Sequence, residues 1–474
     1  MLFHRRFIPG LAIYSYVIGD ESSCEAAVVD PTRDVEEYIR YADENGLTIR
    51  HILETHVHAD FVSGSLELKS RLNGEPRIYC SGMGGDEWTP PYADHVARDG
   101  DHIEMGKVRL QALHTPGHTP EHVSWALYDT SRSAEVPWLV FTGDFLFVGD
   151  VGRPDLLGDE ARKALAHQLY QSVFERLPAL PDLTEIFPSH GAGSLCGKAI
   201  GSRSSSTVGY ERLFNASLAK RSEQEWVGEL LAGMPLAPPY FRRMKQVNRE
   251  GPPLLGRDLP GNRRWKAAQV YERVCSHCLI VDARSKEAFS AAHIAGAINI
   301  PLGPHLPTWA GWVLPYDHPT LIVLDNPDEL PQVVTHLIRV GFDDLRGFLD
   351  GGMEAWQVGG FPFETLETVS VHQLKKRIER GDELTVLDVR TEQEWGKGHV
   401  DGALHVHGGK LQERLAEIPR DRPAAVICAS GYRASIAASF LKRDGYEAVM
   451  NVIGGMTAWK AAGLPVSNER SCLA

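Results

Sequence analysis

The sequence has few cysteines, no long basic run and no long uninterrupted apolar segment. Its seven cysteines among 474 residues are odd in number and scattered, which disfavours a disulfide framework and favours a reducing compartment, the cytoplasm. The net charge of −13 argues against nucleic acids and anionic membrane surfaces as partners. Apolar positions near the N-terminus are interrupted by Pro9 and Gly10, so we expect neither a signal peptide nor a membrane span. These absences favour a cytoplasmic protein that acts on small molecules.

The chain is long enough for about three domains of ~100–200 residues each. Short strand-like runs, such as residues 26–29 and 108–112, alternate with helical stretches such as 34–45 and 159–176, which is typical of an α/β protein. Proline and glycine are concentrated between about residues 233 and 261. We therefore expect a first domain over residues 1–235 and a linker over residues 236–262.

Three side chains that can bind a metal stand at alternate positions directly after an apolar, strand-like segment. They are His56, His58 and Asp60, in the run THVHADF. This run resembles the THxHxDH signature of the metallo-β-lactamase superfamily, which includes glyoxalase II hydrolases and persulfide dioxygenases. Phe61 stands where the signature has its last histidine. Because phenylalanine cannot bind a metal, we expect the second metal of the two-metal members to be lost.

The other ligands that this resemblance implies lie downstream. His118 belongs to a TPGHT turn, in which proline and glycine fix a tight bend, and Asp144 follows an apolar strand in TGD. Together with His56 they form a set of two histidines and one carboxylate that suits non-haem Fe(II) and leaves positions open for substrate and O₂. A tetrahedral zinc ion with three protein ligands and a water would use the same donors. The residue types alone do not choose between these metals.

The resemblance leaves the roles of several neighbours open. His58, Asp60 and, in a later PSHG run, His190 match positions that bind the second metal in two-metal relatives. Here they are either an orphaned second site or residues whose hydrogen bonds orient the ligands. Arg153 lies in a GRPD run that resembles the GR-x-D stretch of the family. It is a candidate for binding a substrate carboxylate or phosphate, with a surface salt bridge as the alternative.

The second half of the chain is an internal repeat. Three motifs of the first copy recur in the second: Asp282-Ala-Arg284 as Asp388-Val-Arg390, HIAGA as HVDGA, and GGMEAW as GGMTAW. The distance between the copies is 106 residues at the HIAGA motif (399 − 293) and 103 residues at the GGMEAW motif (459 − 356). Both copies resemble rhodanese domains, which are α/β sulfurtransferases with a parallel sheet. We expect the first copy over residues 263–364 and the second over residues 365–474.

The two copies differ at the loop that carries rhodanese chemistry. In the second copy, Cys428 lies between a strand-like run and a helical run, where backbone N–H groups and the positive end of the helix dipole stabilise a thiolate. Arg433 adds a positive charge for an anion such as thiosulfate, and Gly431 and Ser435 are further candidates for substrate binding. The Cys-x₄-Arg spacing matches the rhodanese loop, whereas related phosphatases use a loop one residue longer.

The first copy has no such cysteine. The late offset places Asp325 at the equivalent position (428 − 103), and a carboxylate cannot carry sulfur. We expect this copy to be catalytically inactive. Nearby, Cys275 and Cys278 have the spacing of half a zinc site, but no second pair completes it.

The whole chain resembles the persulfide dioxygenase–rhodanese fusions. This implies an α/β multidomain protein, with a metallo-β-lactamase αββα sandwich followed by two rhodanese-like domains with parallel sheets. It also implies oxidation of a low-molecular-weight thiol persulfide by O₂ to sulfite and thiol at one Fe(II), with Zn or Mn as alternatives, and transfer of sulfur to make or use thiosulfate. A zinc-dependent glyoxalase II-like thioester hydrolase fused to a rhodanese remains open, as does a non-enzymatic sulfur sensor. The sequence identifies neither the thiol carrier nor the oligomeric state, and a homo-oligomer stays open.

Overall fold

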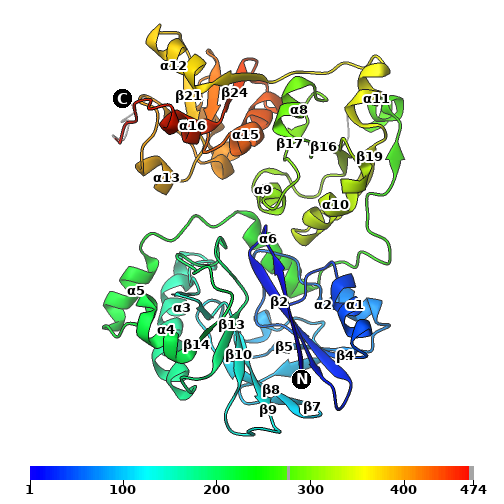
Figure 1. Cartoon of the computed structure of the whole chain (residues 1–474), viewed down its shortest axis with the longest axis vertical. Helices are drawn as coiled ribbons and strands as arrows, with labels where there is room; N and C mark the ends of the chain where they lie inside the picture. The colour runs from blue at the N-terminus through cyan, green and yellow to red at the C-terminus, as the bar shows by residue number, and fades with distance from the viewer. Residues whose placement is uncertain (275–277, 469–474) are drawn as a thin grey trace. The chain divides into compact units, whose positions relative to one another are not determined.

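The chain folds into two units, which the computed structural model describes over residues 1–274 and 278–468 (Figure 1). The first unit comprises Met1–Asp258 and Ile338–Gly341, and the second comprises Leu259–Leu337 and Phe342–Ala474. Cys275 lies outside the described residues, so the structure does not test whether Cys275 and Cys278 could bind a zinc ion together. No helix in the described part of the chain is both long and apolar enough to cross a bilayer.

Two six-stranded sheets form the first unit, and their inner faces share one core. That core contains Leu53 from one sheet and Trp125, Phe141 and Phe187 from the other. The first sheet has the order β1 (Leu2–Ile8), β2 (Ile13–Asp20), β3 (Glu25–Val29), β4 (Thr48–Leu53), β5 (Arg77–Ser81), β6 (His95–Ala97). The second has the order β14 (Ser206–Thr207), β13 (Glu185–Pro188), β10 (Leu139–Gly143), β9 (Val123–Asp129), β8 (Val108–His114), β7 (His102–Met105). A small ribbon joins β11 (Leu146–Phe147) to β12 (Asp150–Val151).

Helices cover the outer faces of both sheets. Tyr38 and Leu68 pack against the outer face of the first sheet, and Leu169 and Trp226 pack in the cluster that contains Ile186 of the second. The helices are α1 (Glu36–Glu44), α2 (Ser65–Arg71), α3 (Asp159–Gln171), α4 (Val208–Phe214), α5 (Glu223–Leu231) and α6 (Tyr240–Glu250). Because apolar residues are buried on both faces of the strands, the layers confirm the expected αββα sandwich.

The segment 236–262, which we expected to be a linker, contains α6. Phe241, Met244 and Asn248 are buried, and their spacing of three and four residues puts them on one face of the helix. Pro239 stands at the N-cap and Gly251, with φ of 103°, at the C-cap. Proline and glycine here bound a helix, and the first unit extends to Asp258.

Two parallel sheets of five strands form the second unit, and the repeat gives both the same order. The first is β15 (Arg264–Trp265), β19 (Leu345–Leu349), β18 (Thr320–Val323), β16 (Leu279–Asp282), β17 (Ile298–Asn299). The second is β20 (Glu367–Ser370), β24 (Val449–Ile453), β23 (Ala424–Ile427), β21 (Thr385–Asp388), β22 (Leu404–His405). Their helices are α7 (Ala267–Gln269), α8 (Lys286–Ala291), α9 (Leu306–Val313), α10 (Leu330–Arg339), α11 (Gly352–Val358), α12 (Val371–Glu379), α13 (Glu392–Gly396), α14 (Leu411–Arg414), α15 (Tyr432–Arg443) and α16 (Gly455–Ala461). The two expected α/β domains with parallel sheets are confirmed.

The strand register corrects the alignment of the two copies at the catalytic loop. Asp282 pairs with Val323 in the first sheet, as Asp388 pairs with Ile427 in the second. The counterpart of Cys428 is therefore Leu324. The prediction of Asp325 was wrong by one residue along the chain. The error arose because the offset at this strand is 104 residues (427 − 323), between the early and late values. Leucine carries no nucleophile, so the first copy still lacks one.

Candidate functional site

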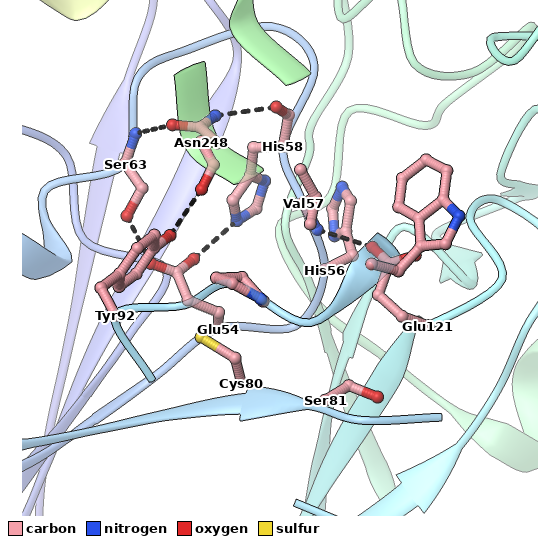
Figure 2. A pocket seen from close by; sticks show the side chains of 12 residues that line it. Glu54, His56, Val57, His58, Ser63, Cys80, Ser81, Tyr92, Glu121 and Asn248 are labelled. Atoms are coloured by element: carbon pink, nitrogen blue, oxygen red, sulfur yellow. Dashed lines mark hydrogen bonds and ion pairs between the residues drawn. The ribbon is translucent and has the colours of Figure 1, made fainter. Parts of the chain in front are cut away.

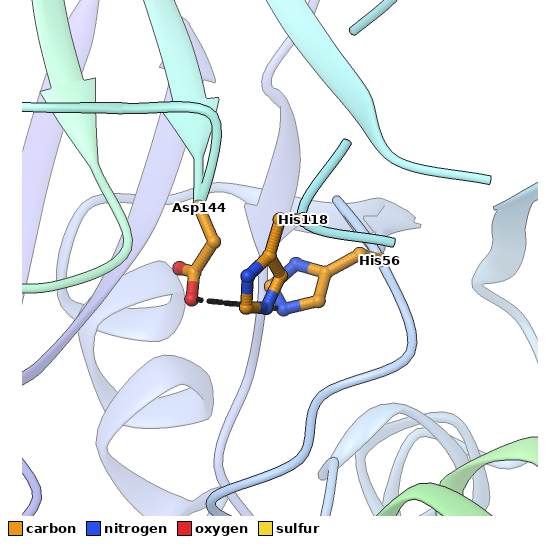
Figure 3. Close-up of side chains that lie close together, drawn as sticks. All are labelled: His56, His118 and Asp144. Atoms are coloured by element: carbon orange, nitrogen blue, oxygen red, sulfur yellow. Dashed lines mark ion pairs between the residues drawn. The ribbon is translucent and has the colours of Figure 1, made fainter. Parts of the chain in front are cut away.

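Turns at the ends of three strands bring His56, His118 and Asp144 together. His56 follows β4, His118 lies in the turn after β8, and Asp144 follows β10 directly. All three are buried, and Figure 3 shows their side chains converging. Asp144 Oδ2 lies 3.4 Å from His118 Nε2 and 4.0 Å from His56 Nε2. Atoms that share one cation at about 2 Å would lie roughly 3 to 3.5 Å apart.

The hydrogen bonding of these residues fits a bound cation. His118 Nε2 and both carboxylate oxygens of Asp144 are buried without a hydrogen-bond partner among the described residues. The other ring nitrogens are held in place: His118 Nδ1 is 2.9 Å from the carbonyl oxygen of Arg153, and His56 Nδ1 is 2.9 Å from Thr55 Oγ1. Fixing one imidazole nitrogen directs the other to a metal. The three residues therefore form a set of donors for one ion.

Burial sets the charge of these donors. It lowers the pKa of His56 and of His118 well below the usual range, and neighbouring histidines add to the effect. Both rings are therefore neutral, the form that binds metals. Burial also raises the pKa of Asp144 to about 6. A cation between the three groups would offset the cost of burying this carboxylate.

His58 points away from this centre. Its Nε2 lies 3.1 Å from Asp30 Oδ1 and 3.4 Å from Glu54 Oε2, and Figure 2 shows the contact with Glu54. Burial lowers the pKa of His58, but the two carboxylates outweigh burial and hold the pKa well above its usual range. Asp30 also accepts hydrogen bonds from the backbone and side chain of Thr55, which contacts His56. The structure thus places His58 beside Asp30, which contacts Thr55, and apart from the three donors.

Removing the Asp30 carboxylate tests whether its contacts with His58 and Thr55 support His56. We expect Asp30→Asn to lower the free energy of unfolding by about 3 kcal/mol, because it leaves the His58 imidazolium buried without full compensation. Metal affinity is expected to fall by roughly tenfold to a hundredfold, because Thr55 and His56 lose their support. Denaturant melts and metal titrations measure the two effects. Glu75→Gln, which breaks the exposed pair with Arg50, is the control and is expected to change neither quantity. Unchanged metal affinity in Asp30→Asn would contradict the orienting role.

Asp60 and His190 lie on the other side of Asp144. Beside them is Cys196, which the sequence analysis did not predict. Cys196 has a sulfur atom close enough to both for the three to hold an ion, and all three are buried. His190 Nε2 lies 3.5 Å from Asp60 Oδ2 and 3.4 Å from Asp144 Oδ1. Burial raises the pKa of the Cys196 thiol well above its usual range, so the thiol stays protonated. No motif of the sequence contains Cys196, so the local sequence gave no signal of this contact.

Arg153 makes a salt bridge, which was the alternative to substrate binding, although the salt bridge is buried and not on the surface. Its guanidinium is buried, with Nε 2.6 Å and Nη2 2.8 Å from the carboxylate of Asp155 and Nη1 2.9 Å from the carbonyl oxygen of Leu195. These contacts involve Nε, Nη1 and Nη2, and binding of a substrate anion by Arg153 stays a prediction. Its carbonyl oxygen faces His118, and Arg153 therefore holds the backbone that positions this ligand.

A narrow pocket reaches His56 from the side of α6 (Figure 2). Asn248 of α6 lines it, and its side chain donates hydrogen bonds to the carbonyl oxygens of His58 and Phe61, at 2.8 and 2.7 Å. Glu121 lines the opposite wall and accepts a hydrogen bond from the backbone of Val57. Burial raises the pKa of Glu121 to about 7. Through the two hydrogen bonds of Asn248, helix α6 holds the loop that follows His56.

The second rhodanese-like domain carries the other candidate centre. Cys428 follows β23 and precedes α15, and the backbone N–H of Gly431 donates a hydrogen bond to its sulfur at 3.1 Å. Gly431 has φ of 95°, a left-handed conformation that glycine adopts without strain. The loop therefore directs at least one backbone donor at the sulfur, as the sequence predicted.

Two other residues of this loop have partners that the sequence did not predict. Arg433 makes a bidentate ion pair with Glu394, with N–O distances of 2.6 and 2.7 Å. Burial raises the pKa of Glu394, but hydrogen bonds from Arg433 outweigh burial and lower it to about 2. Ser435 Oγ donates to Asn299 Oδ1 at 2.6 Å. Glu394 thus offsets the positive charge of Arg433, and the anion-binding role of Arg433 stays a prediction.

Known proteins resemble this chain in both halves. Residues 8–190 match the family model of the metallo-beta-lactamase superfamily, and residues 266–358 and 370–462 match that of the rhodanese-like domain. The mitochondrial persulfide dioxygenase ETHE1 of Bos taurus is 32% identical over 225 residues, which are 47% of this chain and 78% of that protein. The cytoplasmic hydroxyacylglutathione hydrolase of Arabidopsis thaliana is 36% identical over 178 residues, 37% of this chain and 63% of that protein. The crystal structure of a metallo-beta-lactamase from Staphylococcus aureus subsp. aureus COL has a TM-score of 0.66 at 36% identity, and the match covers 74% of this chain and 98% of that one.

Proposed function

Because this chain belongs to the persulfide dioxygenase family and continues into two rhodanese-like domains, it is an enzyme of sulfur metabolism, and we propose that it oxidises a low-molecular-weight thiol persulfide with O₂. The balanced reaction is RSSH + O₂ + H₂O → RSH + SO₃²⁻ + 2 H⁺. The observation that carries the proposal is the buried set of His56, His118 and Asp144. Two histidines and one carboxylate on one face of an ion leave positions open for two further ligands.

The protein's own residues prepare this centre for the reaction. When Fe(II) is bound, it supplies redox chemistry toward O₂ and adjacent positions for O₂ and the persulfide sulfur. His56, His118 and Asp144 would hold it, with Thr55 and the backbone of Arg153 orienting the rings. Burial of these side chains keeps bulk water from the reacting sulfur. Holding both reactants in one site makes their encounter intramolecular.

Cys428 is proposed to transfer sulfane sulfur at the second centre. Its thiolate attacks the outer sulfur of thiosulfate, the S–S bond breaks, and sulfite leaves with the electron pair: Cys–S⁻ + S₂O₃²⁻ → Cys–S–S⁻ + SO₃²⁻. A thiolate acceptor then takes the outer sulfur and restores Cys428. The same steps in reverse convert sulfite from the first centre to thiosulfate. The N–H of Gly431, which donates to Cys428, supports this assignment.

A thioester hydrolase is the second candidate for the first centre. The similarity to the hydroxyacylglutathione hydrolase of Arabidopsis thaliana favours it. The position of His58, turned to Asp30 and Glu54, and the presence of Phe61 argue against the two-metal site that this chemistry uses in relatives. An assay with S-lactoylglutathione separates the two functions. We expect iron-loaded protein to leave this thioester intact while consuming O₂ with glutathione persulfide, and thioester cleavage without O₂ uptake would overturn the proposal.

We further infer a cytoplasmic location from the cysteines. All those that the structure describes are free thiols, namely Cys24, Cys80, Cys196, Cys278 and Cys428. Reduced thiols are typical of the cytosol. The matched ETHE1 protein of Bos taurus is mitochondrial by name, so fractionation of cells is the direct test.

A further inference from the structure

A second, much larger cavity lies next to the metal centre in the first unit. Its volume is about 910 Å³, near the upper end of the range for small-molecule pockets. Its walls come from α3, α6 and the turn around Leu156. Pro120, two residues after His118, lines it, and Trp88 lines both this cavity and the narrow pocket that reaches His56. A ligand in this cavity would therefore have one end beside the metal ligands.

One wall of the cavity is basic. Arg242, Lys245 and Arg249 of α6 line it, and spacings of three and four residues place them on one face of the helix. The only carboxylate among the lining residues is that of Glu87. This wall stands out in a chain whose net charge is −13.

Within the described part of the chain, the two arginines on this wall are not paired with carboxylates, whereas Lys245 lies near Glu121 and Asp155. Neither Arg242 nor Arg249 has an ion-pair partner among the residues that the structure describes. Lys245 is buried, and its ammonium donates a hydrogen bond to the carbonyl oxygen of Leu156 at 2.6 Å. Burial lowers the pKa of Lys245 to about 8. A concave surface with several cations of this kind concentrates anions.

We propose that this cavity binds the carrier portion of the persulfide, and that the carrier is a phosphorylated thiol with several negative charges. Guanidinium groups bind phosphate through paired hydrogen bonds, which suits Arg242 and Arg249. Trp88, Leu156 and Leu157 supply an apolar surface for the uncharged arm that leads to the sulfur. The volume exceeds what cysteine needs. That the sulfur is oxidised rests on the proposed function, whereas binding of the carrier does not.

Calorimetric titration of the metal-loaded full chain with coenzyme A tests this inference. Coenzyme A carries phosphates, and pantetheine has the same thiol arm without them. We expect coenzyme A to bind at least about tenfold more tightly than pantetheine, with an affinity that falls as salt is added. The double variant Arg242→Gln/Arg249→Gln is expected to bind coenzyme A at least about tenfold more weakly and pantetheine unchanged. Lys163→Gln on α3 is the control, because Lys163 is exposed and does not line the cavity, and it is expected to bind like the wild type.

Three results would overturn the inference. They are equal affinity for coenzyme A and pantetheine, wild-type affinity in the double variant, and no binding of coenzyme A to the wild type. Binding is measured without turnover, so an absence of O₂ uptake would count against the proposed function and leave this inference standing. If both hold, the double variant is expected to raise KM for coenzyme A persulfide with little change in kcat, because the arginines contact the carrier and not the reacting sulfur.

Discussion

Replacing His118 with alanine is expected to abolish both metal binding and O₂ consumption. The imidazole is one of three donors, and its Nε2 is buried without another hydrogen-bond partner among the described residues. Alanine leaves two donors, which cannot hold an ion firmly in a site with open positions. Loss of a residue that only supports a ligand costs about tenfold to a hundredfold, so loss of a ligand is expected to reduce activity by more than about a hundredfold. Metal content per chain and O₂ uptake with glutathione persulfide measure the two effects.

Two further variants show whether this loss is specific. His102→Ala removes an exposed histidine of β7 and is expected to keep wild-type metal content and O₂ uptake. Cys196→Ser changes the group on the other side of Asp144, and we expect one metal ion per chain in this variant and in the wild type. Full metal content in His118→Ala would contradict the assigned ligands. Two ions per chain in the wild type and one in Cys196→Ser would show that Asp60, His190 and Cys196 hold a second metal.

Replacing Cys428 with serine is expected to abolish sulfur transfer and leave O₂ uptake unchanged. A serine hydroxyl fills nearly the same space and still accepts the hydrogen bond from Gly431, but it cannot form a persulfide. Loss of a covalent nucleophile is expected to lower the rate by roughly a thousandfold or more. The assay is release of sulfite from thiosulfate with a thiol acceptor, and mass spectrometry of the protein shows the added sulfur on Cys428.

The control for this variant is Cys278→Ser. Cys278 is partly buried in the first rhodanese-like domain, and it is expected to have no part in the transfer. Since the counterpart of Cys428 in that domain is Leu324, no second nucleophile is expected to rescue the activity. Wild-type transfer in Cys428→Ser would contradict the assignment.

The sequence indicated the three donors that the fold brings together because each stands in a short motif at the end of a strand. The turn geometry around His118 and the strand before Asp144 are local properties, and the sheet edge then brings their side chains together. Cys196 was missed because only the fold places its sulfur beside Asp60 and His190. Nothing in the local sequence could have indicated that contact.

The sequence did not indicate every side-chain partner or every helix. Arg433 lies where an anion-binding arginine was expected, but Glu394, 39 residues earlier in the chain, binds its guanidinium. Arg153 makes a buried ion pair with Asp155, only two residues further along the chain, and a salt bridge was the alternative to anion binding at this position. Helix α6 was hidden because proline and glycine flank a stretch whose apolar spacing is helical. For Arg433 the fold supplied a partner that the sequence did not indicate, whereas at α6 the local conformation itself was predicted wrongly.

The centre of His56, His118 and Asp144 is proposed to oxidise a persulfide with O₂. The most direct test is the stoichiometry of O₂ consumed and sulfite formed by the anaerobically iron-loaded Cys428→Ser protein, which cannot convert sulfite to thiosulfate, given a limiting amount of glutathione persulfide or coenzyme A persulfide. For each persulfide we expect one O₂ to be consumed and one sulfite to be formed. The zinc-loaded protein is expected to consume no O₂ and to form no sulfite. Without O₂, the iron-loaded protein is expected to form no sulfite. Release of sulfite or thiol in the absence of O₂ would contradict the proposed oxidation. An iron-loaded protein that consumes no O₂ with either persulfide would also contradict it.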